Sequence, residues 1–270
     1  MNNLFDLKDE IIIITGGTGT IGKAFSKALL NAGAKVILWS RGKTVPLNET
    51  IKEIEIQTNT QNSVFAYKVD VSDKESVKSG LAKIVKDIGI PTVLINGAGG
   101  NKGKSSFIDA DIQVFEDVLK MNLLGGLMIP TQILASYWIK NKVKGSIINV
   151  ASAASYIPLS GVWAYDAAKS AVLNLTMGAA KEFAPYEIRV NGIAPGFFIG
   201  HQNRGLLYED YENKKLSDRG KAIINHTPYN RFGETEDLYG AVVFLASSKA
   251  SGFITGVTLP IDGGYLIDNI

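Results

Sequence analysis

The chain has no cysteine and only two histidines among its 270 residues. The absence of cysteine excludes disulfide bonds, thiolate catalysis and the cysteine-rich type of zinc site. Two histidines are also too few for a histidine-rich metal site. No bound metal is therefore predicted.

Neither sign of charge dominates, since the chain has 28 basic and 26 acidic residues and a net charge of +2. The basic residues form no block of the kind that binds nucleic acids or anionic membrane surfaces, so we expect neither partner. The first ten residues, MNNLFDLKDE, lack the apolar stretch of a signal peptide, and apolar runs elsewhere are interrupted before membrane-spanning length. These features predict a cytoplasmic protein.

Short runs rich in isoleucine and valine recur along the chain, each followed by a segment of helical periodicity or by a turn. Their nearly continuous apolar composition is typical of strands buried on both faces of a parallel sheet. We predict an α/β, single-domain Rossmann fold over residues 1–270: a doubly wound, seven-stranded parallel sheet with helices on both faces. The predicted strands are residues 11–15, 35–40, 64–69, 92–96, 146–150, 189–193 and 256–259, and the clearest helices are 21–32, 74–87 and 235–246.

Residues 197–230 depart from this alternation. The stretch is rich in Asn, Lys, Tyr and Glu and lies between a predicted strand and the last predicted helix. Segments that follow the carboxyl ends of strands form the ligand crevice of open α/β sheets, and such long connections are commonly functional. We therefore expect a substrate lid over about residues 197–230.

A glycine-rich loop, TGGTGTIG at residues 15–22, follows the first predicted strand and opens the first predicted helix. Glycine permits a tight turn and lets the backbone approach a pyrophosphate, whose charge then faces the helix N-terminus. The threonine hydroxyls could donate further hydrogen bonds to phosphate. A plain strand-to-helix turn is the less favoured alternative, because strand and helix both stand where a dinucleotide site needs them. The predicted cofactor contacts in this loop are Gly16, Thr18, Thr20, Ile21 and Gly22.

The end of the second predicted strand bears on the choice between nicotinamide cofactors. An acidic residue there accepts hydrogen bonds from a free ribose diol and repels a 2′-phosphate. This strand instead ends in Ser40, followed by Arg41, and a guanidinium suits a phosphate dianion by charge and geometry. Ser40 and Arg41 are therefore predicted to bind NADP(H), with NAD(H) as the alternative if Arg41 is an ordinary surface residue.

Tyr165 and Lys169 lie four residues apart at the start of an alanine-rich predicted helix. Residues at this spacing share a helix face, and a nearby cation favours phenolate, so the pair suits proton transfer to or from a carbonyl oxygen. Such a pair alone is more often coincidental than catalytic. Ser152, however, directly follows the predicted strand 146–150 and lies thirteen positions before Tyr165, which places a hydroxyl beside the start of this helix.

These three residues and four further signatures occur in an order that resembles the short-chain dehydrogenase/reductase family from end to end. The signatures are NGAG at residues 96–99, MNLLG at 121–125, NGIAPG at 191–196 and DGG at 262–264. Two positions depart from the family pattern: Thr20 stands where the family usually has glycine, and Gly200 stands where it often has threonine. The resemblance implies an NAD(P)-dependent enzyme that interconverts a secondary alcohol and a ketone.

The resemblance also implies a role for each catalytic residue. Tyr165 would be the general acid in reduction and the base in oxidation, and Lys169 would lower its pKa and bind the nicotinamide ribose. Ser152 would hydrogen-bond the substrate oxygen, and Asn122 would hold a water between Lys169 and solvent. A homotetramer packed through the helices around Asn122 and Tyr165 is implied as well. The other implied cofactor contacts are Asp70 and Val71 bordering the adenine, Asn96, Gly97 and Ala98 beneath the dinucleotide, and Pro195, Gly196 and Phe198 near the nicotinamide.

Within the family, three strings are similar to the subgroup of D-mannonate oxidoreductases, or fructuronate reductases. They are NGAGGN at residues 96–101, FFIGHQNR at 197–204 and HTPYNRFG at 226–233. This similarity implies the interconversion of D-mannonate and D-fructuronate. The alternatives are a gluconate 5-dehydrogenase, a neutral sugar or polyol dehydrogenase, and a cofactor-binding regulatory protein without turnover.

A sugar acid needs polar partners and a cation for its carboxylate. Arg204 is the first choice for the cation, because a guanidinium matches a carboxylate in two parallel hydrogen bonds, and Lys102 is the second. Gln202 and Asn203 are the further predicted substrate residues, besides Ser152 and Tyr165. The alternative is that these lid side chains are only solvated surface.

Overall fold

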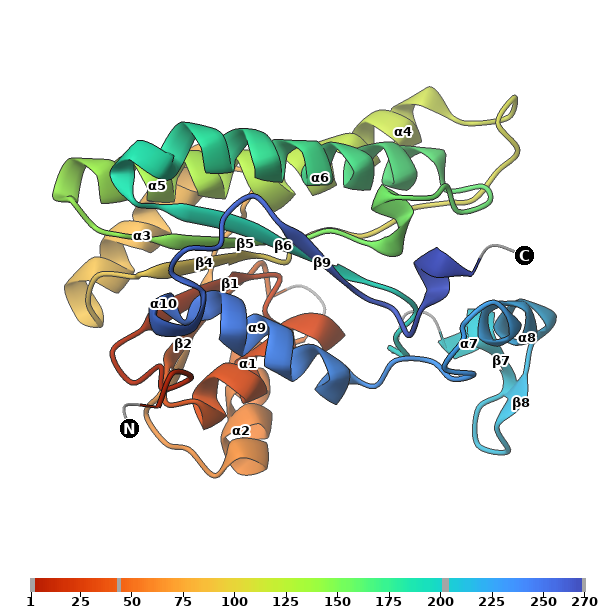
Figure 1. The fold of residues 1–270 in the computed structure, drawn as a ribbon, viewed down its shortest axis with the longest axis horizontal. Coiled ribbons are helices and arrows are strands. Elements are labelled where there is room, and N and C mark those ends of the chain that lie inside the picture. The colour runs from red at the N-terminus through yellow and green to blue at the C-terminus, as the bar shows by residue number, and fades with distance from the viewer. Residues whose placement is uncertain (1–2, 43–44, 201–203, 269–270) are drawn as a thin grey trace.

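The computed structural model describes residues 3–42, 45–200 and 204–268. Its centre is a seven-stranded sheet in the order β3-β2-β1-β4-β5-β6-β9, with every pair of neighbours parallel (Figure 1). The order reverses between β1 and β4, which is the point where an α/β sheet of this kind binds its ligand. The strands are β1 (Ile11–Thr15), β2 (Lys35–Ser40), β3 (Val64–Lys68), β4 (Val93–Asn96), β5 (Ser146–Val150), β6 (Arg189–Pro195) and β9 (Thr258–Ile261).

Helices cover both faces of the sheet (Figure 1), so the predicted doubly wound α/β fold is confirmed. One face carries α1 (Thr20–Asn31), α2 (Leu47–Thr58) and α9 (Tyr239–Ala246), with α10 (Ser248–Ser251) nearby. The opposite face carries α3 (Lys74–Asp87), α6 (Trp163–Phe183) and a long helix formed by α4 (Ile112–Leu119), η1 (Lys120–Met128) and α5 (Ile129–Asn141). Short 3₁₀ turns are η2 (Ala153–Ser155), η3 (Ala184–Tyr186), η4 (Thr235–Leu238) and η5 (Tyr265–Ile267).

The isoleucine run of β1 shows how the sequence places a sheet between two layers of helices. Successive side chains of a strand point to opposite faces. Ile12 and Ile14 accordingly belong to the apolar cluster that includes Leu29 of α1, whereas Ile13 belongs to the cluster that includes Ile84 of α3. All of these side chains are fully buried, and each such burial stabilises the fold by roughly 1.5–3 kcal/mol.

Strand ends differ from the prediction where the backbone turns. The last strand begins two residues later than predicted, because Gly256 has a φ of +82°, outside the β region. The strand predicted at 189–193 continues to Pro195. The extra length carries the chain further into the crevice at the carboxyl ends of the strands.

The helix spanning residues 112–141 is long and apolar enough to cross a membrane by length and composition alone. In the structure it is a core helix, since 56% of its most apolar window is buried. Leu134 and Trp138 pack into the sheet, and the Trp138 indole donates a hydrogen bond to the carbonyl of Pro91 at 2.7 Å.

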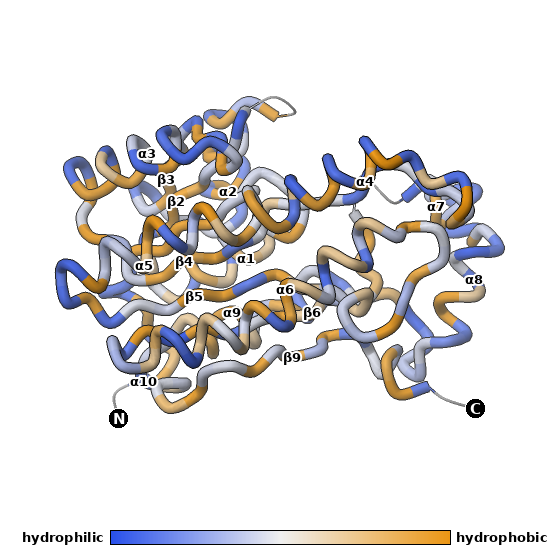
Figure 2. Tube along the Cα trace, turned by 90° about the horizontal axis from the view of Figure 1, so that it is seen from above, coloured by the Kyte–Doolittle hydropathy of each residue, from blue (hydrophilic) through white to orange (hydrophobic). Residues whose placement is uncertain are grey.

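The predicted lid contains an extension with its own secondary structure. It consists of α7 (Arg204–Leu207), the hairpin of β7 (Tyr208–Asp210) and β8 (Lys215–Leu216), and α8 (Asp218–Asn225). Leu207, Ile223 and Phe232 form its small apolar cluster. Figures 1 and 2 place this helical extension at the same end of the molecule as α4 and the C-terminal turn.

Candidate active site

The glycine-rich loop at the end of β1 packs too closely for side chains at two positions. Gly16 has a φ of +68°, and a Cβ there would lie 2.9 Å from the Cα of Ala98. A Cβ at Gly22 would lie 2.6 Å from the carbonyl oxygen of Gly16. These glycines therefore let the loop fold tightly against α1 and against the chain that follows β4.

The N-terminus of α1 presents backbone N–H groups that have no helix carbonyl to pair with. Its N-cap, Gly19, provides no side-chain cap, and no acidic residue lies in the first turn. Helix N-terminal N–H groups without such partners attract phosphate. The residues therefore fit a dinucleotide, whose pyrophosphate would lie over Thr20, Ile21 and Gly22.

The adenosine end of the predicted cofactor site lies where β2 ends. The hydroxyls of Thr18 and Ser40 are 3.1 Å apart, and the Ser40 hydroxyl accepts a hydrogen bond from the N–H of Gly42 at 3.2 Å. Arg41 is exposed and makes no ion pair with the part of the chain that the structure describes. Its guanidinium is therefore available for a phosphate. Asp70, which accepts a hydrogen bond from the N–H of Ser72 at 3.0 Å, and Val71 follow β3.

Asn96 has a different role from the one that its place in the motif suggests. Its buried amide donates hydrogen bonds to the side chains of Thr131 and Asn149, each at 2.9 Å, and so joins β4 to β5 and α5. The side chain is thus directed into the protein, and any cofactor contact of Asn96 would come from its backbone. Gly97 and Ala98 are half-buried at the crevice, and their N–H groups both donate to the Thr15 hydroxyl at 3.0 Å.

The predicted catalytic hydroxyls come together at the end of β5. Ser152 is the N-cap of η2, and Tyr165 lies in the first turn of α6, within hydrogen-bond reach of Ser152. Ser155, which was not predicted, holds this arrangement: its hydroxyl donates to the carbonyl of Lys169 at 2.7 Å and fastens η2 to α6. Only contacts across the fold show this role, and the sequence has no signal for it.

Lys169 lies one turn after Tyr165 and is buried, with only 6% of its surface exposed. Its ammonium donates a hydrogen bond to the carbonyl of Val150 at 2.7 Å and lies 5.6 Å from the centre of the Tyr165 ring. Burial lowers the pKa of Lys169 to about 8. The spacing predicted this proximity correctly.

The electrostatics at Tyr165 differ from the expectation that Lys169 lowers its pKa. Burial raises the pKa of Tyr165, a hydrogen bond from Ser152 partly opposes this, and Asp166 adds to the increase. Desolvation disfavours the phenolate, while the Lys169 ammonium is directed at a backbone carbonyl instead. Tyr165 is therefore a protonated phenol near neutral pH, which is the form that donates a proton.

Asn122 lies in η1, a π-helical segment within the long helix. Its amide donates to the carbonyls of Gly100 and Val118 at 2.8 Å, and its oxygen accepts the N–H of Gly100 at 3.1 Å. A Cβ at Gly99 would lie 2.5 Å from the Asn122 oxygen and 3.8 Å from the Lys169 nitrogen. Because residue 99 is glycine, the space between these two polar groups stays open.

The π-helical geometry was not predicted, although such segments are frequent at functional sites. A possible signal was the pair Gly125 and Gly126 within an otherwise apolar helix. A Cβ at Gly126 would lie 2.5 Å from the carbonyl oxygen of Ala98. The glycine pair thus lets the helix approach the crevice closely.

The two cations predicted for a carboxylate have different surroundings. Lys102 is exposed and forms an ion pair with Asp117 at 3.4 Å. The guanidinium carbon of Arg204 lies 4.1 Å from the centre of the Tyr211 ring, and its Nε is buried with no hydrogen-bond partner among the described residues. Gln202 and Asn203 lie outside the described residues. Arg204 is thus the candidate with unused donor capacity.

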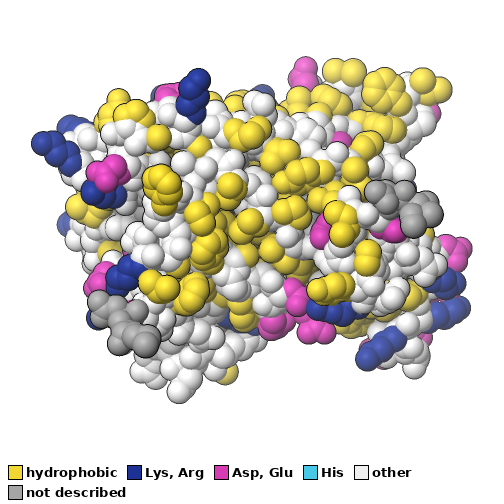
Figure 3. Space-filling model, viewed as in Figure 1, with side chains coloured by type: hydrophobic (Ala, Val, Ile, Leu, Met, Phe, Trp, Pro, Cys, Tyr) yellow, Lys and Arg dark blue, Asp and Glu magenta, His cyan; other side chains and the backbone are white. Residues whose placement is uncertain are grey.

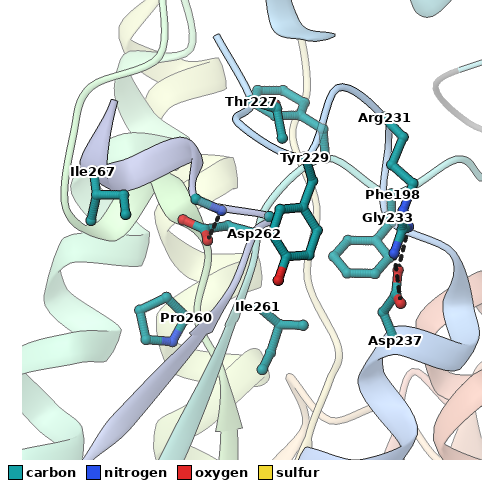
Figure 4. A pocket seen from close by; sticks show the side chains of 13 residues that line it. Phe198, Thr227, Tyr229, Arg231, Gly233, Asp237, Pro260, Ile261, Asp262 and Ile267 are labelled. Atoms are coloured by element: carbon teal, nitrogen blue, oxygen red, sulfur yellow. Dashed lines mark hydrogen bonds and ion pairs between the residues drawn. The ribbon is translucent and has the colours of Figure 1, made fainter. Parts of the chain in front are cut away.

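The segment 226–233 lines a pocket of about 460 Å³ beside the end of β9 (Figure 4). Tyr229 points into it, and Phe198 and Ile261 form part of its wall. Arg231 also lines the pocket but is held by Asp237 through two hydrogen bonds, at 2.7 and 3.0 Å. Arg231 is therefore unavailable as a free partner for a substrate carboxylate.

Comparison with known proteins gives the family of this chain. The model of the short chain dehydrogenase family matches residues 10–206. The chain is 32% identical over 267 residues to the 2-dehydro-3-deoxy-D-gluconate 5-dehydrogenase of Formosa agariphila, with 98% of this chain and 95% of that protein covered.

Two solved structures are similar over nearly their whole length. One, from Haemophilus influenzae with bound NAD, is provisionally named a D-mannonate oxidoreductase; it has a TM-score of 0.86, 35% identity and 99% coverage of both chains. The other, a gluconate 5-dehydrogenase from Burkholderia cenocepacia in complex with NADP and tartrate, has a TM-score of 0.86, 28% identity and 98% coverage of both chains.

The chain therefore belongs to the short-chain dehydrogenase/reductase family. It is an NAD(P)-dependent oxidoreductase, and the family assignment made from the Ser, Tyr and Lys residues and the glycine signatures is confirmed.

Proposed function

We propose that the chain interconverts D-mannonate and D-fructuronate, the alcohol and the ketone at carbon 5 of a six-carbon sugar acid, and that it favours NADP(H). The observation that carries the sugar-acid assignment is the buried Nε of Arg204, which has no hydrogen-bond partner in the part of the chain that the structure describes. An unsatisfied buried donor costs about 1–3 kcal/mol, and more when the group is charged. A carboxylate would satisfy this donor.

The link between Arg204 and the cofactor loop supports its role as the partner of the carboxylate. Its backbone N–H donates to the carbonyl of Gly200 at 3.2 Å, and Gly200 in turn lies against Thr20 of the cofactor loop. The Tyr211 ring supports one face of the guanidinium, which restricts its orientation and leaves its edge for a planar anion. Lys102 is a weaker candidate because Asp117 already neutralises it.

In this proposal the residues of the chain move one proton for each hydride transferred. Bound NAD(P) supplies the hydride to the substrate carbon or accepts it. In reduction the Tyr165 phenol donates its proton to the carbonyl oxygen, while the Ser152 hydroxyl hydrogen-bonds that oxygen. In oxidation the Tyr165 phenolate takes the proton back. A water in the open space beside Gly99, between Asn122 and Lys169, would return protons to the site from solvent.

The related proteins support a sugar acid with chemistry at carbon 5. The Formosa relative is named a 2-dehydro-3-deoxy-D-gluconate 5-dehydrogenase, and the Burkholderia structure is a gluconate 5-dehydrogenase. The second candidate function is therefore gluconate 5-dehydrogenase, which would use the same residues on a substrate of different stereochemistry. For either acid the carboxylate lies four carbon–carbon bonds from the reacting carbon.

A cytoplasmic homotetramer is part of the proposal. Ile112 of α4, Leu124 of η1 and Met177 of α6 are large apolar side chains that are 70%, 48% and 49% exposed on the helices around the active site. Figure 3 shows a further group of apolar side chains over the open edge of the sheet, between α6 and α9. Two separate apolar faces suit the two kinds of contact in a tetramer with three twofold axes.

The test is a panel of keto acids and neutral ketoses with each reduced cofactor, in which the rate is measured as the loss of NAD(P)H absorbance. The panel contains D-fructuronate, 5-keto-D-gluconate, D-fructose and L-sorbose. The proposal predicts the highest kcat/KM for D-fructuronate with NADPH. A highest value for 5-keto-D-gluconate would instead select the second candidate, and preference for the neutral ketoses would refute both.

A further inference from the structure

Gly200, which follows β6, lies against the first residue of α1. A Cβ added at Gly200 would lie 3.1 Å from the Oγ1 of Thr20, 3.5 Å from its Cβ and 3.6 Å from its Cγ2. All three of the nearest atoms thus belong to one side chain. A side chain at position 200 would therefore crowd the Thr20 hydroxyl and lie in van der Waals contact with the rest of that side chain.

Both residues lie where two parts of the cofactor would meet. Thr20 begins α1, whose first N–H groups face the pyrophosphate site. Gly200 is two residues after Phe198, which lines the pocket beside the end of β9 and which the family resemblance implies near the nicotinamide. The other hydroxyl of the loop, that of Thr18, is directed at Ser40 on the adenosine side. The two threonines therefore serve different halves of the site.

We propose that Thr20 and Gly200 form a matched pair, in which the Thr20 hydroxyl binds the pyrophosphate–nicotinamide half of the cofactor in place of a side chain at position 200. The two departures from the family pattern then compensate for each other, since a Cβ at position 200 would lie 3.1 Å from the Thr20 hydroxyl oxygen. The inference rests on NAD(P) binding and is independent of the sugar-acid assignment.

The exchange changes which structural element carries the hydroxyl. A hydroxyl at position 200 would belong to the chain that follows β6, outside the helices of the core. On Thr20 the hydroxyl belongs to a helix whose Phe25 and Leu29 are fully buried in the core. The hydroxyl is therefore carried by a helix that is anchored in the core.

The first experiment measures cofactor affinity by fluorescence titration. Thr20→Val keeps the shape of the side chain but removes the hydroxyl, so its affinity for NADPH is expected to fall about ten- to hundredfold, as for a hydrogen bond to a charged group. Thr20→Ser keeps the hydroxyl and should stay within about threefold of the wild type. Adenosine 2′,5′-bisphosphate, which lacks the other half of the dinucleotide, should bind all three proteins equally. Equal NADPH affinity of Thr20→Val and the wild type would overturn the proposal.

The second experiment tests the exchange itself with a double-mutant cycle. Gly200→Thr and Thr20→Gly should each lower the affinity for NADPH about tenfold or more. The affinity of the double variant should return to within about threefold of the wild type. Gly205→Ala is the matched control, because a Cβ there meets nothing within 4 Å, and its affinity should not change. A double variant as weak as the product of the two single effects would contradict the pairing. If Gly200→Thr fails to fold, the Val and Ser variants still decide the role of the hydroxyl.

Discussion

The Lys169 ammonium lies 5.6 Å from the centre of the Tyr165 ring, but its hydrogen bond goes to the carbonyl of Val150, at 2.7 Å. Burial disfavours the charged form of both groups, which raises the pKa of Tyr165 and lowers that of Lys169 to about 8. Near neutral pH both groups are therefore protonated, and the phenol can donate its proton in reduction.

Replacement of Tyr165 by phenylalanine tests the proton donor. The variant keeps the ring but loses the hydroxyl, so the kcat of ketone reduction is expected to fall by about a hundredfold or more. The affinity for NAD(P)H should change little, because Lys169 and the glycine-rich loop are intact. Steady-state kinetics and a fluorescence titration check the two parts, and a near-normal kcat would rule out Tyr165 as the acid.

The pH dependence of reduction should follow Lys169. Its folded pKa of about 8 is below the ordinary value of 10.5, so the ammonium is charged below about pH 8 and loses its proton above it. Tyr165 stays protonated over this range, since its pKa is raised. Because Lys169 borders the proposed path that returns protons to Tyr165, we expect kcat/KM for the ketone to be level below about pH 8 and to fall above it. The profile of kcat/KM from pH 6 to about pH 10 measures this, and a level profile up to about pH 10 would disagree.

Arg41 tests the choice of cofactor. If its guanidinium binds the 2′-phosphate, Arg41→Ala should weaken the binding of NADPH by about 1.5–3 kcal/mol and leave the binding of NADH almost unchanged. Titration of the wild type and the variant with both reduced cofactors measures the difference. Equal losses for the two cofactors, or a clear preference of the wild type for NADH, would refute the phosphate contact.

Arg204 tests recognition of the carboxylate. Arg204→Ala should raise KM for D-fructuronate by the equivalent of about 2–3 kcal/mol and change KM for D-fructose much less. Lys102→Ala is the matched control, because Lys102 is already paired with Asp117, and it should have the smaller effect on the acid. An equal loss for the acid and the neutral ketose in Arg204→Ala would assign this residue a structural role.

Local patterns predicted the parts of this molecule that depend on neighbours in sequence. The four-residue spacing of Tyr165 and Lys169 places them on one helix face wherever that helix lies. Ser152 required only the rule that carboxyl ends of parallel strands share an edge. The isoleucine run of β1 predicted a strand with the bounds that the structure has.

Features that depend on distant neighbours could not be predicted in this way. The inward direction of Asn96 requires Thr131 and Asn149, which lie on other elements. The π-helical segment at Asn122 depends on how closely its helix approaches the loop after β4. The direction of the pKa of Tyr165 depends on burial and on the carbonyl that accepts the Lys169 hydrogen bond, and neither can be deduced from spacing.

The most direct test of the proposed function compares D-fructuronate with D-fructose, which differ only by a carboxylate in place of a terminal hydroxymethyl group. The measurement is kcat/KM of the wild-type enzyme for each, with NADPH, at one pH below 8. The account predicts a ratio of about thirty or more in favour of D-fructuronate, the factor that corresponds to about 2 kcal/mol of carboxylate recognition. A ratio near one, or a preference for D-fructose, would contradict it.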